Sequence, residues 1–293
     1  MFPKLTINYV VAIMNKFIRN NFLAICITLA VVYAFAKKAT IFQQEPKSKV
    51  ETVVSINQET NKTFTDYWNK GKIETTKYDL KEDSISVGEG SLTFSIDYVE
   101  GVNKTDSIQV LHSDFSGKIH KENYDYSAMT STYLPLNQKL RPHAMKVINS
   151  VQEPAVNSFL ELSQIPKSYE IESDNTFKEK IKKHFILERK NLEDELWAKI
   201  RMNPNDLPTG DIEIIPSFAY WQSVRKSPNI YEAKAELKDY VGTEFTGKKL
   251  KIYTLDYPDL KRNLSIIFEG DFPFEIVGWK RVSEGKVAVG VRK

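Results

Sequence analysis

The 293-residue chain contains 41 Lys and Arg against 38 Asp and Glu, and a single cysteine. Three basic residues and no acid fall within the first 36 positions, so the following 257 residues (293 − 36) hold 38 basic (41 − 3) and 38 acidic side chains. This zero net charge argues against a nucleic-acid binder, which usually has a strong basic excess. The residues after Cys26 can form neither a disulfide nor a Cys-ligated metal site.

Residues 1–36 predict an export signal or a membrane anchor. Lys16 and Arg19 precede an apolar run from Phe22 to Ala36, which closes with the small residues Ala34 and Ala36. This pattern is typical of a secretory signal. The apolar run is shorter than the roughly 20 residues of a spanning helix. We therefore expect cleavage and a location in the periplasm or cell envelope, with a retained anchor through Phe22 to Ala36 as the alternative.

The remaining chain predicts a polar arm and one domain rich in strands. Residues 37–62 are rich in Lys, Glu, Gln and Asn, which favours a linker or arm before a domain over 63–293. From there apolar and polar residues alternate in short segments, as they do in half-buried strands. We expect strands at 91–98, 108–112, 145–151, 156–162, 231–238, 264–268, 274–276 and 287–291.

Two segments predict helices. The first begins after Asn191, which with Asp194 approximates a capping box, and Pro204 prevents its continuation. Its apolar stripe is Leu192, Leu196 and Ile200. The acids Glu193 to Glu195 suit the positive end of this helix. The second helix is Phe218 to Val224. The predicted fold class is mainly β (α+β), a twisted antiparallel sheet or half-barrel with one or two packed helices, after an N-terminal signal or anchor helix.

No motif in the sequence specifies a catalytic, cofactor or metal site. The four histidines lack metal-ligand spacing, and no glycine-rich phosphate loop is present. Ser223 to Lys226 fits S-x-x-K and Ser173 to Asn175 fits S-D-N, but their order is reversed relative to penicillin-recognising enzymes and K-T-G is absent. We expect no catalytic residue and no cofactor. A hydrolase whose site assembles only in three dimensions is the alternative.

Basic and aromatic side chains are the candidates for a binding surface. Lys and Arg crowd residues 178–190, where they suit anionic lipid headgroups or an acidic partner. Trp and Tyr are enriched at interfaces. The candidate surface consists of Tyr220, Trp221, Lys182, Lys183 and Trp279. The alternatives are a solvated face for the lysines and a core position for the aromatic residues.

Several segments together resemble an uncharacterised family of exported Bacteroidota proteins, some of which carry the name septum formation inhibitor. The segments are Tyr67 to Lys72, Met129 to Thr132, Leu192 to Arg201, Asn203-Pro204, Leu207 to Gly210, Ile214 to Pro216 and Phe272 to Trp279. True septum-inhibitor pyrophosphatases need an S-x-S-P-R-R motif, which is absent here. No catalytic residue is assigned in the family, so the resemblance transfers none. Relatives often look like lipoproteins and continue further beyond the position of Trp279, which are departures from this chain.

We expect a non-enzymatic envelope protein that binds a lipid-like ligand or a protein partner on the periplasmic side, and no nucleic acid. A single-pass accessory subunit of a membrane complex is the alternative if Phe22 to Ala36 is retained. A large apolar pocket would favour the lipid-like ligand. An exposed apolar patch would favour the protein partner.

Overall fold

The computed structural model describes residues 62–68, 71–101, 107–154, 156–175 and 181–293. Every described residue belongs to the second of two units of the chain, Ser55–Lys293. The predicted signal or anchor helix, and the predicted arm up to residue 61, lie outside the described residues. All elements below belong to the second unit. No helix in the described ranges has the length and apolarity that a bilayer crossing requires.

The predicted mainly-β fold is confirmed by one 15-stranded sheet. Its first strands are β1 (Ile73–Glu82), β2 (Ile85–Glu100), β3 (Ser107–Lys121), β4 (Tyr124–Pro135), β5 (Lys146–Glu153), β6 (Val156–Gln164), β7 (Ser168–Asn175) and β8 (Ile181–Glu188). The others are β9 (Asn191–Leu192), β10 (Gly210–Ile215), β11 (Tyr231–Asp239), β12 (Leu250–Tyr257), β13 (Arg262–Glu269), β14 (Ile276–Ser283) and β15 (Lys286–Arg292). The helices are α3 (Lys62–Trp68), α4 (Leu196–Met202) and α5 (Phe218–Val224), with 3-10 turns at Glu193–Glu195 (η1), Pro204–Asp206 (η2) and Pro258–Leu260 (η3).

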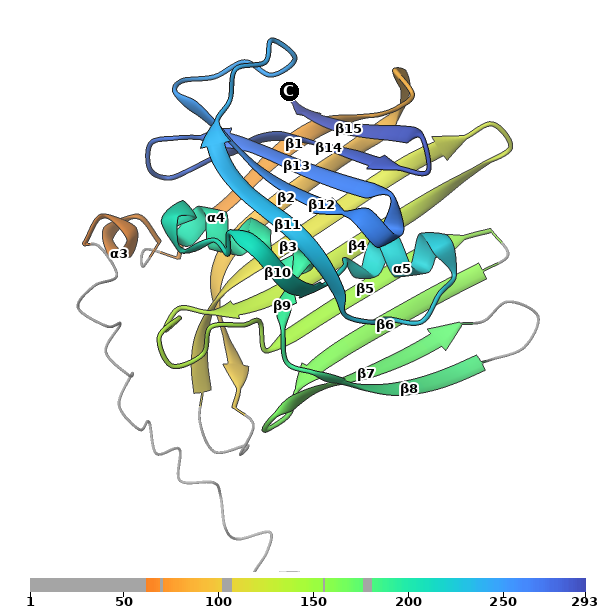
Figure 1. Ribbon diagram of the computed structural model, residues 1–293, viewed down its shortest axis with the longest axis horizontal. Coiled ribbons are helices and arrows are strands. Elements are labelled where there is room, and N and C mark those ends of the chain that lie inside the picture. Colours follow the sequence, from red (N-terminus) through yellow and green to blue (C-terminus); the bar gives the residue numbers. More distant parts are fainter. Residues whose placement is uncertain (1–61, 69–70, 102–106, 155, 176–180) are drawn as a thin grey trace, which may run out of the picture. The chain divides into compact units, whose positions relative to one another are not determined.

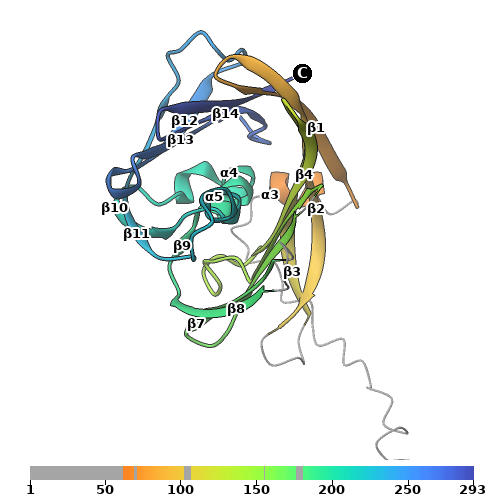
Figure 2. The ribbon, with the colours of Figure 1, turned by 90° about the vertical axis from the view of Figure 1, so that its right-hand side faces the viewer.

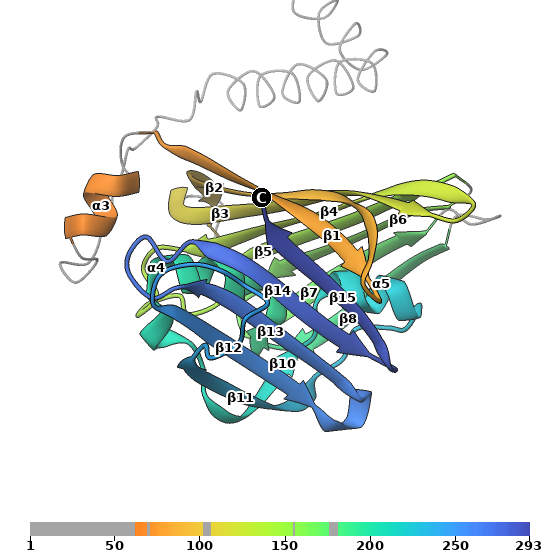
Figure 3. The same cartoon turned by 90° about the horizontal axis from the view of Figure 1, so that it is seen from above.

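The strands form two antiparallel meanders that meet side by side. Strands β1 to β8 follow one another in the sheet, as do β10 to β15, and β15 then pairs with β1 so that Tyr78 lies opposite Arg292 (Figure 1). Figure 3 shows the same junction from above, with β15 beside β1. The short strand β9 is parallel to β10, in contrast to the antiparallel pairs elsewhere. The sheet order therefore ends at β8 on one side and at β9 on the other.

The sheet curls around two of its helices, as the predicted half-barrel requires. Figure 2 shows α4 and α5 between the wall formed by β1 to β4 and the wall formed by β10 to β14. Alternation along each strand separates an inner from an outer face. On β13, Ile266 and Phe268 join the large inner core, whereas Ile267 joins a small outer core with Phe245 and Val277.

Most of the predicted elements are found, with several differences. The strand expected at 274–276 is largely loop, because β14 starts only at Ile276 and Phe274 has a positive φ of 57°. Helix α5 has the expected bounds, Phe218–Val224. The first helix differs, because residues 191–192 are a strand, Glu193–Glu195 are a 3-10 turn and α4 starts at Leu196. Asn191 therefore does not cap it. Strands β1, β4, β7, β8, β10 and β12 were not among the predicted segments. They alternate less clearly, since charged and polar residues occupy many of their positions.

Candidate functional site

The most acidic part of the interior is the turn that leads from β9 into α4. Its residues Glu193, Asp194 and Glu195 are all buried, with 2%, 7% and 0% of their surface exposed. Burying an ionised carboxylate costs several kcal/mol unless cations and hydrogen bonds compensate it. The neighbours of each acid therefore decide which charges this interior holds.

Glu193 is fully compensated by Arg262 of β13. Both guanidinium Nη atoms lie 2.5 Å from its carboxylate oxygens, and the Tyr257 hydroxyl donates a third hydrogen bond at 2.8 Å. The Arg262 guanidinium also lies 4.8 Å from the centre of the Tyr220 ring. Burial raises the pKa of Glu193, but the charge and hydrogen bonds of Arg262 outweigh this effect and hold the pKa below its usual range. Glu193 is thus a structural anion.

Glu195 is compensated by a second set of donors. Its carboxylate lies 2.8 Å from Lys199 Nζ and 3.1 Å from His143 Nδ1, and it accepts a hydrogen bond from the Ala144 backbone N–H at 2.7 Å. Burial raises the pKa of Glu195, and the Lys199 charge with these contacts lowers it below the ordinary value. This acid ties α4 to the loop that precedes β5.

Asp194, between these two, has a different environment. It accepts a hydrogen bond from the Phe218 N–H at 2.9 Å, at the start of α5. In the part of the chain that the structure describes, no cation forms an ion pair with it. Burial, together with the charge of Glu193, raises the pKa of Asp194 to about 7 in spite of the Phe218 hydrogen bond. Asp194 thus titrates near neutrality, at a buried position.

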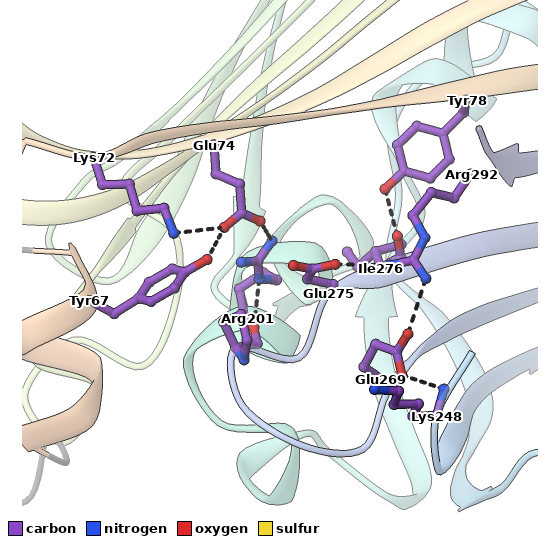
Figure 4. Close-up of polar contacts among 11 residues, drawn as sticks. Tyr67, Lys72, Glu74, Tyr78, Arg201, Lys248, Glu269, Glu275, Ile276 and Arg292 are labelled. Carbon is purple, nitrogen blue, oxygen red and sulfur yellow. Dashed lines mark hydrogen bonds and ion pairs between the residues drawn. The ribbon is translucent and has the colours of Figure 1, made fainter.

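Arg201, at the end of α4, organises a third polar cluster at the junction of α3 and β1 (Figure 4). Its Nε donates to the Pro273 carbonyl at 2.8 Å and its Nη1 lies 2.5 Å from Glu74 of β1. Glu74 also accepts a hydrogen bond from Tyr67 and lies 3.7 Å from Lys72. Burial raises the pKa of Glu74, and the contact with Arg201 lowers it below the ordinary value.

The Arg201 guanidinium lies between aromatic rings. Its centre is 4.8 Å from the Phe94 ring and 5.3 Å from the Trp68 ring. Its Nη2 and the Trp68 Nε1 have no acceptor among the described residues. Both side chains are buried, and neither of the two hollows described below reaches them. This cluster therefore joins elements rather than presenting an open site.

The loop between β13 and β14 is held from both sides. Arg201 binds its Pro273 carbonyl, and Arg292 of β15 pairs with Glu269 at 3.0 Å and with Glu275 at 2.9 Å. Figure 4 shows Arg292 pointing toward Glu269. Residues from α3, α4 and the β13–β14 loop thus meet at this position. The Tyr67 ring also packs edge-on against Phe272, 5.2 Å away.

The outer face of β12 to β15 carries the best candidate for recognition from outside. Residues 240–249, here called the strap, cross this face, and Phe245 packs against Gly278, Ile267, Val277 and Val289. A Cβ at Gly278 would lie 2.3 Å from the Phe245 ring, so glycine permits this contact. Two hollows of about 780 and 580 Å³ border the strap. The smaller one, called the valine groove, is lined by Lys81, Asp83, Ser84, Glu244, Lys280, Val287, Val289 and Val291.

The structure does not bring the five candidate surface residues together. Tyr220, Trp221 and Trp279 are 8%, 1% and 2% exposed, because they face the inner core. Trp279 packs against Tyr78, Phe115 and Trp197, and Tyr220 covers Arg262. The expectation of one aromatic and basic surface is corrected accordingly. Lys182 and Lys183 are exposed on the edge strand β8.

The short catalytic motifs of the sequence have ordinary structural explanations. The Ser223 hydroxyl donates to the Tyr220 carbonyl at 2.7 Å, and helix α5 ends at Arg225 in the left-handed conformation. Ser223 and Lys226 therefore do not share a helix face. Within the described ranges, no three His, Cys, Asp or Glu side chains form a group that could hold a metal ion.

Comparison with solved structures gives a distant likeness. No protein-family model matches the chain, and no curated protein matches it. Among solved structures, it is similar to a beta-barrel-like protein of a domain of unknown function, DUF1849, from Brucella abortus. The two are 8% identical, the match covers 75% of this chain and 94% of that one, and the TM-score is 0.44. The description of the fold therefore rests on the sheet itself.

Proposed function

We propose that this chain is a non-enzymatic envelope protein that binds a protein partner through its outer surface. A lipid-like ligand would need an apolar cavity of its own size. The inner face of the curled sheet is instead packed against α4, α5 and buried aromatic side chains such as Trp221 and Trp279. Glu193 and Glu195 are held by this chain's own donors, which leaves them no role toward a substrate.

The observation that carries the proposal is the apolar strip on the outer face of β15. The solvent face of an antiparallel sheet is normally polar. Here Val287, Val289 and Val291 all point outward, and the strap covers this strip incompletely, so that Val287 and Val291 are only partly buried. Apolar surface that is rimmed by charged residues is typical of protein-binding sites.

The valine groove indicates what the partner presents. Its floor of three valines suits one apolar anchor side chain, and its volume of about 580 Å³ accommodates a large one. Its rim carries both signs of charge, with Lys81 and Lys280 as cations. Lys280 is 3.2 Å from Glu244 of the strap. We therefore expect a partner with an apolar anchor flanked by charged residues of both signs.

Site-specific crosslinking tests the proposal. The photoreactive residue p-benzoylphenylalanine replaces Lys81 at the groove rim, and the protein is irradiated in the envelope of the cells that make it. We expect a discrete adduct with one protein. Val287→Glu places a charge on the floor of the groove and should abolish the adduct, whereas Met129→Glu, at a partly exposed position of β4, should leave it intact.

Native mass spectrometry of the protein extracted in mild detergent supplies the second readout. A stoichiometric lipid mass that survives Val287→Glu would contradict the proposal and favour the lipid-like ligand. A protein adduct that Val287→Glu and Val289→Glu both leave unchanged would remove the valine groove as the binding site.

A further inference from the structure

Strand β8 lies at one edge of the sheet. Among the described residues, it pairs with β7 on one side and with no strand on the other. In an antiparallel sheet, every second residue of such a strand points its N–H and C=O away from its neighbour. These N–H and C=O groups can form hydrogen bonds with the backbone of another extended segment.

Strand β9, at the opposite end of the sheet order, follows β8 directly in the chain. Strand β10 pairs with β9 through Ile214 and Ile215 alone, so β9 covers one end of it. Lys190 fastens this corner, because its Nζ lies 3.2 Å from Glu188 and 2.6 Å from Glu213 of β10. The edge strand is thus fixed at its carboxyl end, next to the start of β9, and is held in an extended conformation before any partner arrives.

The side chains of β8 divide the strand into a basic and an apolar half. Lys182 and Lys183 are exposed, and no ion pair joins either to another residue in the described ranges. His184 follows them and pairs with Glu170 at 2.8 Å, and two residues further Ile186 is 52% exposed on the outer face. Phe185 and Leu187 point to the inner face and are only partly buried against the core. An added strand would cover these three apolar side chains.

We propose that β8 binds an extended polypeptide segment of a partner as an additional strand, with acidic residues opposite Lys182 and Lys183 and apolar residues opposite Phe185 to Leu187. Consecutive residues of a strand point to opposite faces. Two adjacent acids therefore reach both lysines, one on each face of the sheet. The inference rests on the proposed function, since it requires a protein partner, but it uses a different surface from the valine groove.

Peptide binding followed by hydrogen exchange tests this assignment. The probe is a fluorescent nine-residue peptide of alternating Val and Thr with Glu-Glu near one end, and the control peptide has Lys-Lys there. We expect the Glu-Glu peptide to bind and to slow amide exchange in residues 182–188. Opposite charges on facing residues of two strands attract and like charges repel, so reversing both lysines should weaken binding of the Glu-Glu peptide about tenfold or more.

Two matched controls make the test specific. The double variant Lys182→Glu/Lys183→Glu should lose the Glu-Glu peptide and gain the Lys-Lys peptide. Lys77→Glu/Lys118→Glu, at exposed positions of β1 and β3, should change neither. Two further peptides are N-methylated on alternate residues, one on the odd and one on the even positions. Each pattern removes the N–H donors from one edge of the peptide strand. Only the pattern that removes the donors facing β8 should abolish binding.

Three results would overturn the inference. If the parent protein and Lys182→Glu/Lys183→Glu bind the Glu-Glu peptide equally well, the two lysines do not recognise acidic residues. Binding of anionic phospholipid vesicles that this variant abolishes, without peptide binding, would assign β8 to a membrane surface. Self-association of Lys182→Gln/Lys183→Gln, without peptide binding, would show that the lysines merely protect the edge. In each case the crosslink through Lys81 at the valine groove would still test the proposed function separately.

Discussion

The interior turn Glu193–Glu195 and the edge strand β8 both contain runs of like charge, and the fold treats them in opposite ways. Inside, Glu193 and Glu195 are surrounded by donors from distant parts of the chain, and Asp194 has its pKa raised instead. At the edge, Lys182 and Lys183 are exposed to solvent and form no described ion pair. Buried charge must be matched within the molecule because desolvation is costly, whereas exposed charge is free to meet another molecule.

The largest expected effect comes from leaving a buried charge without its partner. Arg262→Met removes the guanidinium that binds both oxygens of Glu193, and we expect the free energy of unfolding to fall by about 3–5 kcal/mol in urea titrations. The double variant Glu193→Gln/Arg262→Met removes both charges and should recover more than half of this loss. If the double variant is as unstable as the single one, the loss comes from packing rather than from charge.

The next effect depends on pH. The folded state raises the pKa of Asp194 from 3.8 to about 7, so between these values the unfolded chain releases a proton that the folded chain keeps. Folding stability therefore decreases as pH rises through this window. Asp194→Asn stays neutral, and we expect it to exceed the parent protein in stability by on the order of 2–4 kcal/mol at pH 8 but not at pH 4.

Thermal and urea unfolding across pH 4 to 8 measures this difference. Asp259→Asn, at an exposed position, serves as the matched control and should follow the parent profile. A constant offset between Asp194→Asn and the parent protein at every pH would contradict the assignment of the titration to Asp194.

A smaller effect is expected on the outer face. Phe245 anchors the strap over Gly278, and Phe245→Ala should lower stability by roughly 2–3 kcal/mol, because the exposed strap can relax into part of the cavity. Hydrogen exchange should accelerate within residues 240–249. Val241→Ala, at a position that is 95% exposed, should change neither quantity. Acceleration throughout β12 to β15 would show that the strap supports the sheet itself.

The smallest effect on stability belongs to the edge strand. Lys182→Glu/Lys183→Glu should shift the free energy of unfolding by no more than about 0.5 kcal/mol, since exposed substitutions seldom do more. The same variant should alter peptide binding about tenfold, as argued above. A fall in the free energy of unfolding above roughly 1 kcal/mol would mean that the lysines stabilise the β7–β8 hairpin. The exposed lysines would then have a structural role, as the buried Glu193 and Glu195 do.

The sequence predicts the fold class because apolar and polar residues alternate wherever one face of a strand is buried and the other is exposed. Ile266, Ile267 and Phe268 show where the pattern becomes ambiguous, since both faces of β13 are apolar there. Helix α5 was predicted with its observed bounds, and Ser217 caps it by accepting a hydrogen bond from the Tyr220 N–H. Polar strands such as β1 were missed, because Lys, Glu and Thr mask the inner positions Tyr78 and Leu80.

The candidate sites were less predictable, since they depend on contacts between distant residues. Glu193 and Arg262 are 69 positions apart, and no local pattern links them. The three acids suit an exposed helix start equally well, and only the surrounding sheet buries them. Trp279 was assigned to a surface because aromatic residues favour interfaces, but it lies over Gly290 on the inner face, where a Cβ would be 2.3 Å from its ring. Lys182 and Lys183 were placed among candidate residues, but not at a sheet edge.

The pairing of β1 with β15 also governs the order in which this domain can be completed. Tyr78 and Arg292 are register partners although they are 214 positions apart (292 − 78). A contact between such distant residues carries a high loop-closure entropy and slows folding. Each meander can form from strands that are close in the sequence, but β1 can pair with β15 only after β15 has been synthesised. The sheet therefore stays open along β1 until then.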